Sequence, residues 1–279
     1  MMTFTRFVLA TTSVCFIVHA NILKPLQNRI ACVTGATRGI GKGIAISLAD
    51  AGATVYITGR SDESGPTDKI LGGTLAEVVK EIESRNGKCV GIRVDHKNDE
   101  DVKNFFQKVD ETVGGLDILV NNAFELPSDS ANSSATTDVL FQKFWEQPGY
   151  FYDAIMDVGL RSHYISTVYA FPLLKRRKIS DPSSTPTIFH ISSFGGASYS
   201  FNVAYGVGKA GVDRMARDMA KELASEGNTV LFISPISQFF LNLKSYLGIS
   251  CFSIYPGVVR TERMAPILSS GNQYNQCNF

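Results

Sequence analysis

The chain has 279 residues, of which 44% are hydrophobic, and its formal net charge at pH 7 is +1. This length and composition suit one α/β domain with a sizeable core, and the balanced charge gives no basic excess for nucleic acid or an anionic membrane. The five cysteines and four histidines are scattered without a Cys-x-x-Cys pair or a ligand cluster, so neither a metal site nor a disulfide framework is predicted.

The first predicted element is an apolar segment near the N-terminus. Residues 7–18 follow a lone Arg6 and precede His19, so residues 1–20 have the character of a signal-peptide core or a short anchor. A helix needs about 20 apolar residues to span a bilayer, and this run is shorter. We expect membrane association through the N-terminus, with endoplasmic reticulum or secretory-route placement. A cytoplasmic protein and an artefactual extension stay open as alternatives.

A glycine-rich turn follows the first predicted strand. The apolar run Ile30–Val33 leads into Gly35, Gly39 and Gly41, and a helical stretch follows at 44–49. Glycines let the backbone turn sharply and approach a pyrophosphate, while the helix N-terminus offers N–H groups and a positive dipole end. The pattern predicts a dinucleotide-phosphate site, although a tight turn that binds nothing would have the same sequence pattern.

Strand and helix signals alternate along the rest of the chain. Strands are predicted near residues 30–34, 53–58, 89–94, 116–121 and 187–192, each followed by a helical stretch. This rhythm predicts an α/β fold with a doubly wound parallel sheet that is covered by helices on both faces. A ligand is expected at the carboxyl ends of the strands.

Tyr205 and Lys209 carry the strongest chemical signal, within a predicted helix at 203–226. Residues i and i+4 share one helix face, so a phenol and an ammonium would lie side by side. A fixed cation should lower the phenol pKa from about 10 toward the range useful for acid–base catalysis. Ser193 offers a hydroxyl that could hold a carbonyl oxygen at the same place, and Ser192 stays open for that role.

Together these features resemble the short-chain dehydrogenase/reductase family over roughly residues 28–265. The glycine turn, the triplet Asn121–Ala123, the serine and the Tyr-x3-Lys pair fall in the family's order and spacing. The resemblance implies a single Rossmann-like domain that transfers hydride between NAD(P)H and a small-molecule carbonyl or alcohol, with steroid-like or xenobiotic carbonyls as candidates. Ser193 would polarise the oxygen, Tyr205 would exchange the proton, and Lys209 would hold the nicotinamide ribose and stabilise the phenolate.

Cofactor preference is predicted from the end of the second strand. Thr58–Arg60 contains no carboxylate, so Arg38 and Arg60 could pair with a 2′-phosphate, unless both arginines are merely solvated. NADP(H) is therefore the preferred cofactor, with NAD(H) as the second. By the resemblance, Asp95 and Asn121 would contact adenine and adenosine, or only cap a helix or turn. The expected nucleotide contacts are Gly35, Arg38, Gly39, Ile40, Gly41, Arg60, Asp95, Asn121, Tyr205, Lys209 and Thr261.

Several departures from the family pattern are visible. Gly159 stands where the family usually has asparagine. Two segments, 228–235 and 249–257, compete for the sixth strand, so residues 228–248 are predicted to be an insertion. An irregular tail at 266–279 replaces the family's last strand, which we expect to be missing. A catalytically silent nucleotide-binding or interaction protein, from an aberrant or truncated isoform, is the alternative to an enzyme, and the oligomeric state stays open.

Overall fold

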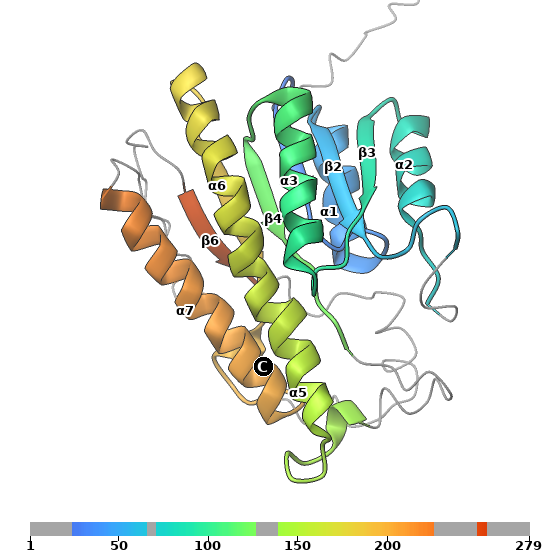
Figure 1. Ribbon diagram of the computed structural model, residues 1–279, viewed down its shortest axis with the longest axis vertical. Coiled ribbons are helices and arrows are strands. Elements are labelled where there is room, and N and C mark those ends of the chain that lie inside the picture. Colours follow the sequence, from blue (N-terminus) through green and yellow to red (C-terminus); the bar gives the residue numbers. More distant parts are fainter. Residues whose placement is uncertain (1–23, 66–70, 127–138, 226–249, 256–279) are drawn as a thin grey trace, which may run out of the picture.

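A six-stranded parallel sheet forms the centre of the structure (Figure 1). The computed structural model describes residues 24–65, 71–126, 139–225 and 250–255. The strands are β1 (Ile30–Val33), β2 (Thr54–Gly59), β3 (Lys88–Arg93), β4 (Ile118–Asn121), β5 (Thr187–Ile191) and β6 (Ser250–Ile254). Their order is β3-β2-β1-β4-β5-β6, and each neighbouring pair is parallel. The predicted α/β fold with a doubly wound parallel sheet is confirmed.

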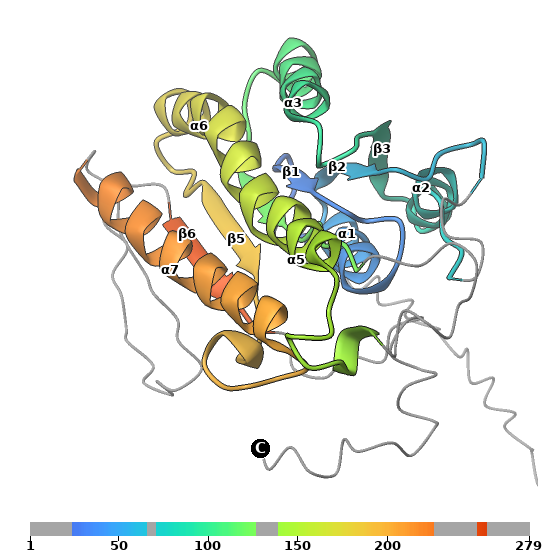
Figure 2. The same cartoon turned by 60° about the horizontal axis from the view of Figure 1, so that its bottom comes forward.

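Helices cover both faces of this sheet, as Figures 1 and 2 show. The α-helices are α1 (Gly39–Asp50), α2 (Leu75–Ser84), α3 (Asp99–Val113), α5 (Gly149–Met156), α6 (Ser162–Ser180) and α7 (Val203–Ser225). A π-helical turn, η1 (Asp157–Arg161), joins α5 to α6, and a short 3-10 turn, η2 (Phe194–Gly196), follows β5. The helices expected after the first strand and at 203–226 are therefore present.

The hydrophobic core is divided by the sheet into two clusters. One cluster contains Cys32 together with buried residues of α3, α6 and α7, and the other contains Ala31 and Val33 together with buried residues of α1 and α2. Successive side chains of a strand point to opposite faces, so a single apolar strand such as β1 supplies both clusters. This packing fixes the ends of the strands, from which the functional loops emerge.

A third, smaller apolar cluster lies where α5 meets α7. Leu140, Phe151, Ile155 and Ala204 are buried in it, and partly buried aromatic residues pack against them. Because α5, η1 and α6 follow one another without a break, this cluster also anchors the π-helical turn. Such turns are rare and occur frequently at functional sites.

The sixth strand position is occupied by the second of the two competing segments. β6 pairs with β5 in parallel, with Ser253 opposite His190. The first candidate and the predicted insertion at 228–248 lie outside the described residues, as do the segment 1–20, Thr261 and the tail at 266–279 with the question of a last strand. Among the helices that the structure describes, none is both long and apolar enough to cross a membrane.

Candidate active site

A cleft of about 230 Å³ opens among the loops that follow β1, β2, β3 and β4. Seven of the predicted nucleotide contacts line it, and the structure therefore brings the glycine turn, Arg60 and Asp95 together. The lining residues are Gly35, Thr37, Arg38, Gly39, Ile40, Gly41, Gly59, Arg60, Ser61, Val94, Asp95, His96, Asn122, Ala123, Phe124, Glu125 and Val158.

The glycine turn is held against the segment that follows β4. Gly35 has a φ of 66°, and a Cβ atom on it would lie 2.8 Å from Cα of Ala123. A Cβ on Gly41 would collide with the Gly35 carbonyl and with the Asn122 side chain. Asn122 Nδ2 donates to the carbonyl oxygens of Thr34 and Gly35, both at 2.9 Å. Glycine is therefore required here by close backbone packing as well as by turn geometry.

Asn121 does not line the cleft, contrary to the expected adenosine contact. Its side chain is fully buried, and its Nδ2 donates to Thr167 Oγ1 at 2.9 Å and lies 3.4 Å from His190 Nδ1. The alternation of side chains at the end of β4 turns Asn121 into the core and leaves its neighbour Asn122 at the cleft. His163 is also buried, with Nε2 3.1 Å from the Ala123 carbonyl.

The end of β2 itself contains no carboxylate, as the sequence indicated, but a carboxylate from another segment lies beside Arg60. Glu125 reaches this place from the segment after β4, and its Oε1 lies 2.8 Å from Nη1 of Arg60. The same carboxylate pairs with Lys97 Nζ at 2.7 Å. The local sequence of β2 contains no sign of this contact, because the partner lies 65 positions further along the chain.

The remaining predicted contacts on this side of the cleft are engaged with the backbone. Arg38 donates from Nη1 to the Gly72 carbonyl. Asp95 accepts a hydrogen bond from the Lys97 amide at 3.0 Å, so it closes a local turn and lines the cleft at the same time. His96, which the sequence did not suggest, is buried in the wall with Nε2 2.7 Å from Thr58 Oγ1, and burial lowers its pKa to about 4.

Ser193 and Tyr205 are hydrogen-bonded at the carboxyl end of β5. The Tyr205 hydroxyl donates to Ser193 Oγ at 2.8 Å, and the amide of Gly195 donates to the same oxygen at 3.1 Å. Lys209 lies one turn further along α7, and its Nζ donates to the Ile191 carbonyl at 3.0 Å. Ser192 is buried and bonds to the Lys209 carbonyl at 3.3 Å, so Ser193 is the serine beside the phenol.

The electrostatics of this trio differ from the expectation. Burial raises the pKa of Tyr205, and the hydrogen bond with Ser193 opposes that shift. Burial also lowers the pKa of Lys209 to about 8, with Asp213 acting in the opposite direction. The expected lowering of the phenol pKa by Lys209 is therefore wrong, because desolvation dominates and the ammonium lies 5.9 Å from the Tyr205 ring centroid.

Phe124 connects the cleft to the trio. It lines the cleft, its ring centroid is 4.6 Å from Lys209 Nζ, and the centroids of Phe124 and Tyr205 are 5.9 Å apart in an edge-to-face arrangement. The sequence analysis missed this residue, although it directly follows the Asn121–Ala123 triplet. The cleft and the trio are thus adjacent parts of one site.

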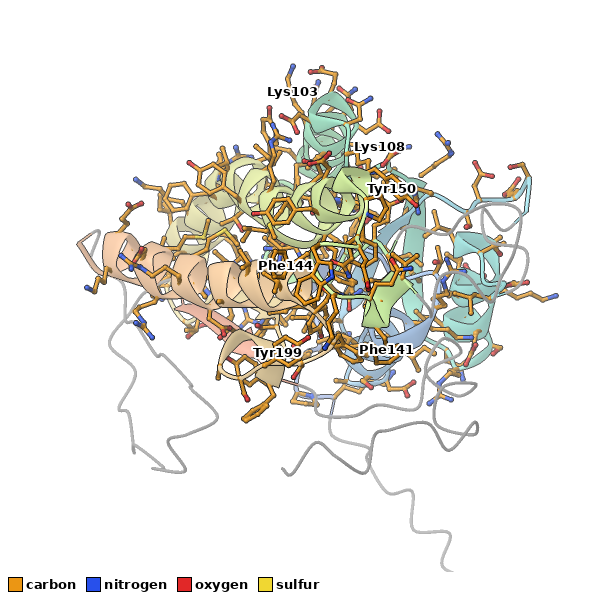
Figure 3. The ribbon with its side chains drawn as sticks, turned by 90° about the horizontal axis from the view of Figure 1, so that it is seen from below. Lys103, Lys108, Phe141, Phe144, Tyr150 and Tyr199 are labelled. Carbon is orange, nitrogen blue, oxygen red and sulfur yellow. The ribbon has the colours of Figure 1, made fainter. Side chains whose placement is uncertain are left out.

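Aromatic side chains extend from the trio to the molecular surface. The rings of Phe201 and Tyr205 have centroids 4.9 Å apart, and those of Phe141 and Phe201 are 5.8 Å apart. Phe141 is 48% exposed, and Tyr199 is 68% exposed. Figure 3 shows both on the face seen from below, together with the exposed side chains of Phe144 and Tyr150. This side of the trio is therefore apolar.

Comparison with known proteins identifies relatives over most of the chain. Residues 29–237 match the sequence model of the family described as short chain dehydrogenase. That match includes the first sixth-strand candidate, whereas the structure pairs Ser250–Ile254 with β5. Within the described residues, the strand that pairs with β5 is therefore Ser250–Ile254.

Two curated relatives and one solved structure show the extent of the similarity. Dehydrogenase/reductase SDR family member 1 from Mus musculus is 37% identical over 249 residues, which are 89% of this chain and 66% of that protein. The Homo sapiens protein of the same name is 38% identical over 239 residues, which are 85% and 63%. The chain thus spans less than two thirds of the human relative. The Pseudomonas aeruginosa RhlG/NADP active-site complex has a TM-score of 0.66 and 26% identity, covering 88% of this chain and 79% of that chain.

Proposed function

Because the chain belongs to the short chain dehydrogenase family, we propose that it is an NADP(H)-preferring oxidoreductase that reduces an apolar carbonyl compound to an alcohol. The observation that carries this proposal is the hydrogen bond between Tyr205 and Ser193 beside Lys209, at the end of a glycine-lined cleft. A proton donor and a nucleotide-sized cleft next to each other are what carbonyl reduction requires.

The glycine turn fits a dinucleotide. A side chain at Gly35 or Gly41 would fill the narrow space between the glycine turn and the segment at Ala123. The N-terminus of α1 at Gly39 also lines the cleft. Backbone N–H groups at a helix N-terminus favour a pyrophosphate. When bound, the nicotinamide of this cofactor supplies the hydride.

Tyr205 is the proton donor in this proposal. Burial raises its pKa, so the phenol is protonated at neutral pH and suits reduction, in which the carbonyl carbon gains hydride and the oxygen gains the phenolic proton. The Ser193 oxygen already accepts hydrogen bonds from Tyr205 and Gly195, which leaves its own proton to polarise the carbonyl. Alcohol oxidation would need the phenolate and therefore a higher pH.

Lys209 supports the same proton transfer. Burial keeps the resting phenol protonated, and the ammonium, 5.9 Å from the Tyr205 ring centroid, can stabilise the negative charge that develops as the proton leaves. Its bond to the Ile191 carbonyl holds it at the end of β5. Its position on α7 also suits the ribose contact that the family resemblance implies.

The preference for NADP(H) rests on two guanidinium groups at the far side of the cleft. Arg38 and Arg60 both line it, and guanidinium forks match phosphate geometry. Glu125 already pairs with Arg60, so a 2′-phosphate would compete with that carboxylate. The preference over NAD(H) should therefore be modest.

The apolar character of the substrate is inferred from the aromatic side chains beside Tyr205. Phe201 contacts the Tyr205 ring, and Phe141 continues this surface outward. An apolar carbonyl compound, such as a steroid-like or xenobiotic ketone, would bury its hydrocarbon part against these rings.

The test is NADPH consumption by the purified chain with a panel of apolar ketones, beside Tyr205→Phe. The wild type should turn over, and the variant should lose roughly 10²–10⁴-fold in rate while binding NADPH equally well in a fluorescence titration. Equal turnover by both proteins would remove Tyr205 from the mechanism. Nucleotide binding without turnover would favour the catalytically silent alternative, and absence of binding would end the proposal.

A further inference from the structure

We propose that Phe124 is a positioning residue for Lys209, and that Gly159 is the residue that makes room for its ring. The face of the Phe124 ring would hold the ammonium at the end of β5, while the edge-to-face contact between the two rings orients Tyr205. This inference deepens the proposed function and rests on it, since it concerns how the catalytic lysine is kept charged and in place.

The first observation is the surroundings of the ammonium. Lys209 is only 6% exposed, and its Nζ is 4.6 Å from the Phe124 ring centroid. The Ile191 carbonyl accepts one hydrogen bond from this group. An ammonium has three N–H donors, and an aromatic face can stabilise a cation that has been removed from water.

The second observation is the close fit between Phe124 and the π-helical turn. A Cβ atom on Gly159 would lie 2.7 Å from Cδ2 and 2.9 Å from Cε2 of the Phe124 ring. Real Cβ atoms do not approach other atoms so closely, so any side chain at residue 159 would push the ring away. Phe124 and Gly159 therefore form a size-matched pair between the segment that follows β4 and η1.

The third observation is that the same ring contacts both members of the acid–base pair. Its centroid is 5.9 Å from that of Tyr205, with an interplanar angle of 90°, so one ring presents its face to the cation and makes an edge-to-face contact with the phenol. Within the described residues, the phenylalanine and tyrosine rings that lie near the Lys209 ammonium are those of Phe124 and Tyr205. Movement of Phe124 would disturb both groups together.

The titratable groups around the ammonium come from the helices α7 and α6 and from strand β5. Tyr205 and Asp213 lie on its own helix α7, and His163 faces it from α6. His190 of β5 lies next to His163, with ring centroids 5.6 Å apart. Burial lowers the pKa of each histidine well below its usual value, so both are neutral near pH 7 and do not compete as cations. Asp213 and the Phe124 ring are left to favour the ammonium.

The test is the Lys209 titration in protein labelled with ε-¹³C-lysine, followed by NMR in Phe124→Leu and Phe124→Tyr. Leucine keeps an apolar side chain but removes the aromatic face, so the pKa of Lys209 should fall by about one unit, a tenfold change in its ionisation. Tyrosine keeps the face and should leave the pKa near the wild-type value. The alkaline limb of the activity profile should move in parallel.

Phe201→Leu is the matched control. Phe201 also contacts the Tyr205 ring, with centroids 4.9 Å apart. Among the described residues, the cation–ring contacts of Lys209 are with Phe124 and Tyr205 and not with Phe201. This variant should leave the Lys209 pKa unchanged. An equal shift in Phe201→Leu and Phe124→Leu would mean that general loosening of the site, and not the ring face, controls the lysine, and would overturn the proposal.

Gly159→Ala tests the second half of the proposal and carries the test alone if Phe124→Leu does not fold. The added methyl group should displace the ring and lower the Lys209 pKa in the wild-type background, but should add nothing in Phe124→Ala, where the space is open. An unmoved Lys209 pKa in the folded variants would overturn the inference and leave the proposed function standing. Failure of the wild type to bind NADPH would instead end the proposed function, since this titration needs no nucleotide.

Discussion

The two ends of the cleft wall are held together by different kinds of interaction. At the catalytic end, Phe124 packs against Lys209, which is 6% exposed. At the other end, Arg60 and Lys97 pair with Glu125; the side chains of the two cations are 41% and 42% exposed, and that of Glu125 is 13% exposed. Exposed ion pairs contribute about 0–1 kcal/mol to the free energy of unfolding, because water and salt screen the two charges. Buried contacts are not screened in this way, so their loss has a larger effect. The degree of burial at the two ends therefore predicts unequal effects of substitution.

The largest effect in the cleft wall is expected at Gly41. In Gly41→Ala the methyl group would meet the Gly35 carbonyl and the Asn122 side chain, and overpacking of this kind costs about 1–3 kcal/mol. If that cost appears in nucleotide binding, the Kd for NADPH rises about fivefold to 150-fold. Fluorescence titration with NADPH measures the part of this cost that appears in nucleotide binding, and urea unfolding measures the part that appears in the stability of the protein.

Gly43→Ala is the matched control on the same helix. A Cβ there meets nothing within 4 Å, so alanine should keep nucleotide affinity and stabilise the protein by about 0.5–1 kcal/mol through helix propensity. Equal behaviour of the two variants would show that the turn is not closely packed and would weaken the contrast between the two ends.

An intermediate effect is expected from His96, which is buried between the two ends. Its folded-state pKa of about 4 lies below the unfolded value of about 6.5, so the unfolded chain alone gains this proton between those values. The contribution of His96 to stability is complete above pH 6.5 and is lost as the pH falls toward 4, at about 1.4 kcal/mol per unit.

The comparison variant is His96→Asn, studied by urea unfolding at pH 7 and pH 5. The stability advantage of the wild type over this variant should shrink by about 2 kcal/mol between the two pH values, because the variant has no imidazole to protonate at this position. Parallel loss of stability in both proteins would assign the acid sensitivity to other groups, such as His163 or His190.

The features that follow from local patterns were predictable from the sequence. The β1 run, the glycine turn and the i, i+4 spacing of Tyr205 and Lys209 each depend on residues that are near one another in the chain. The strands were therefore predicted close to their observed bounds. Ser193 was assigned its role through the family resemblance, and the structure places it, not Ser192, beside the phenol.

The features that were missed depend on contacts between distant segments. Glu125 reaches Arg60 from 65 positions away, and Phe124 fits Gly159 because the segment that follows β4 lies close to η1. The phenol pKa was predicted in the wrong direction, since spacing gives proximity to Lys209 but not the desolvation of Tyr205. The periodicity of apolar residues indicates which face of a helix or strand a residue occupies, but not which distant residues pack against that face.

The smallest effect is expected at the exposed end of the cleft. Glu125→Gln would release Arg60 and Lys97 from their shared carboxylate, so the Kd for NADPH should tighten about threefold to tenfold while that for NADH stays within about twofold. The effect should fade at high salt. Titration of both nucleotides at low and high ionic strength measures it.

A distant ion pair supplies the control for this substitution. Glu100 pairs with Lys103 on the surface of α3, so Glu100→Gln should change affinity for neither nucleotide. Equal tightening for NADH and NADPH in Glu125→Gln would contradict a role of this carboxylate at the 2′-phosphate.

The most direct test of the account is hydride transfer itself. With NADPH deuterated at the transferring position of the nicotinamide ring and an apolar ketone, mass spectrometry should find one deuterium on the carbinol carbon of the product. The wild type should form that product, and Tyr205→Phe should form it roughly 10²–10⁴-fold more slowly at saturating nucleotide. An alcohol without deuterium, or equal rates of labelled product from both proteins, would contradict the assignment of this cleft and its tyrosine to carbonyl reduction.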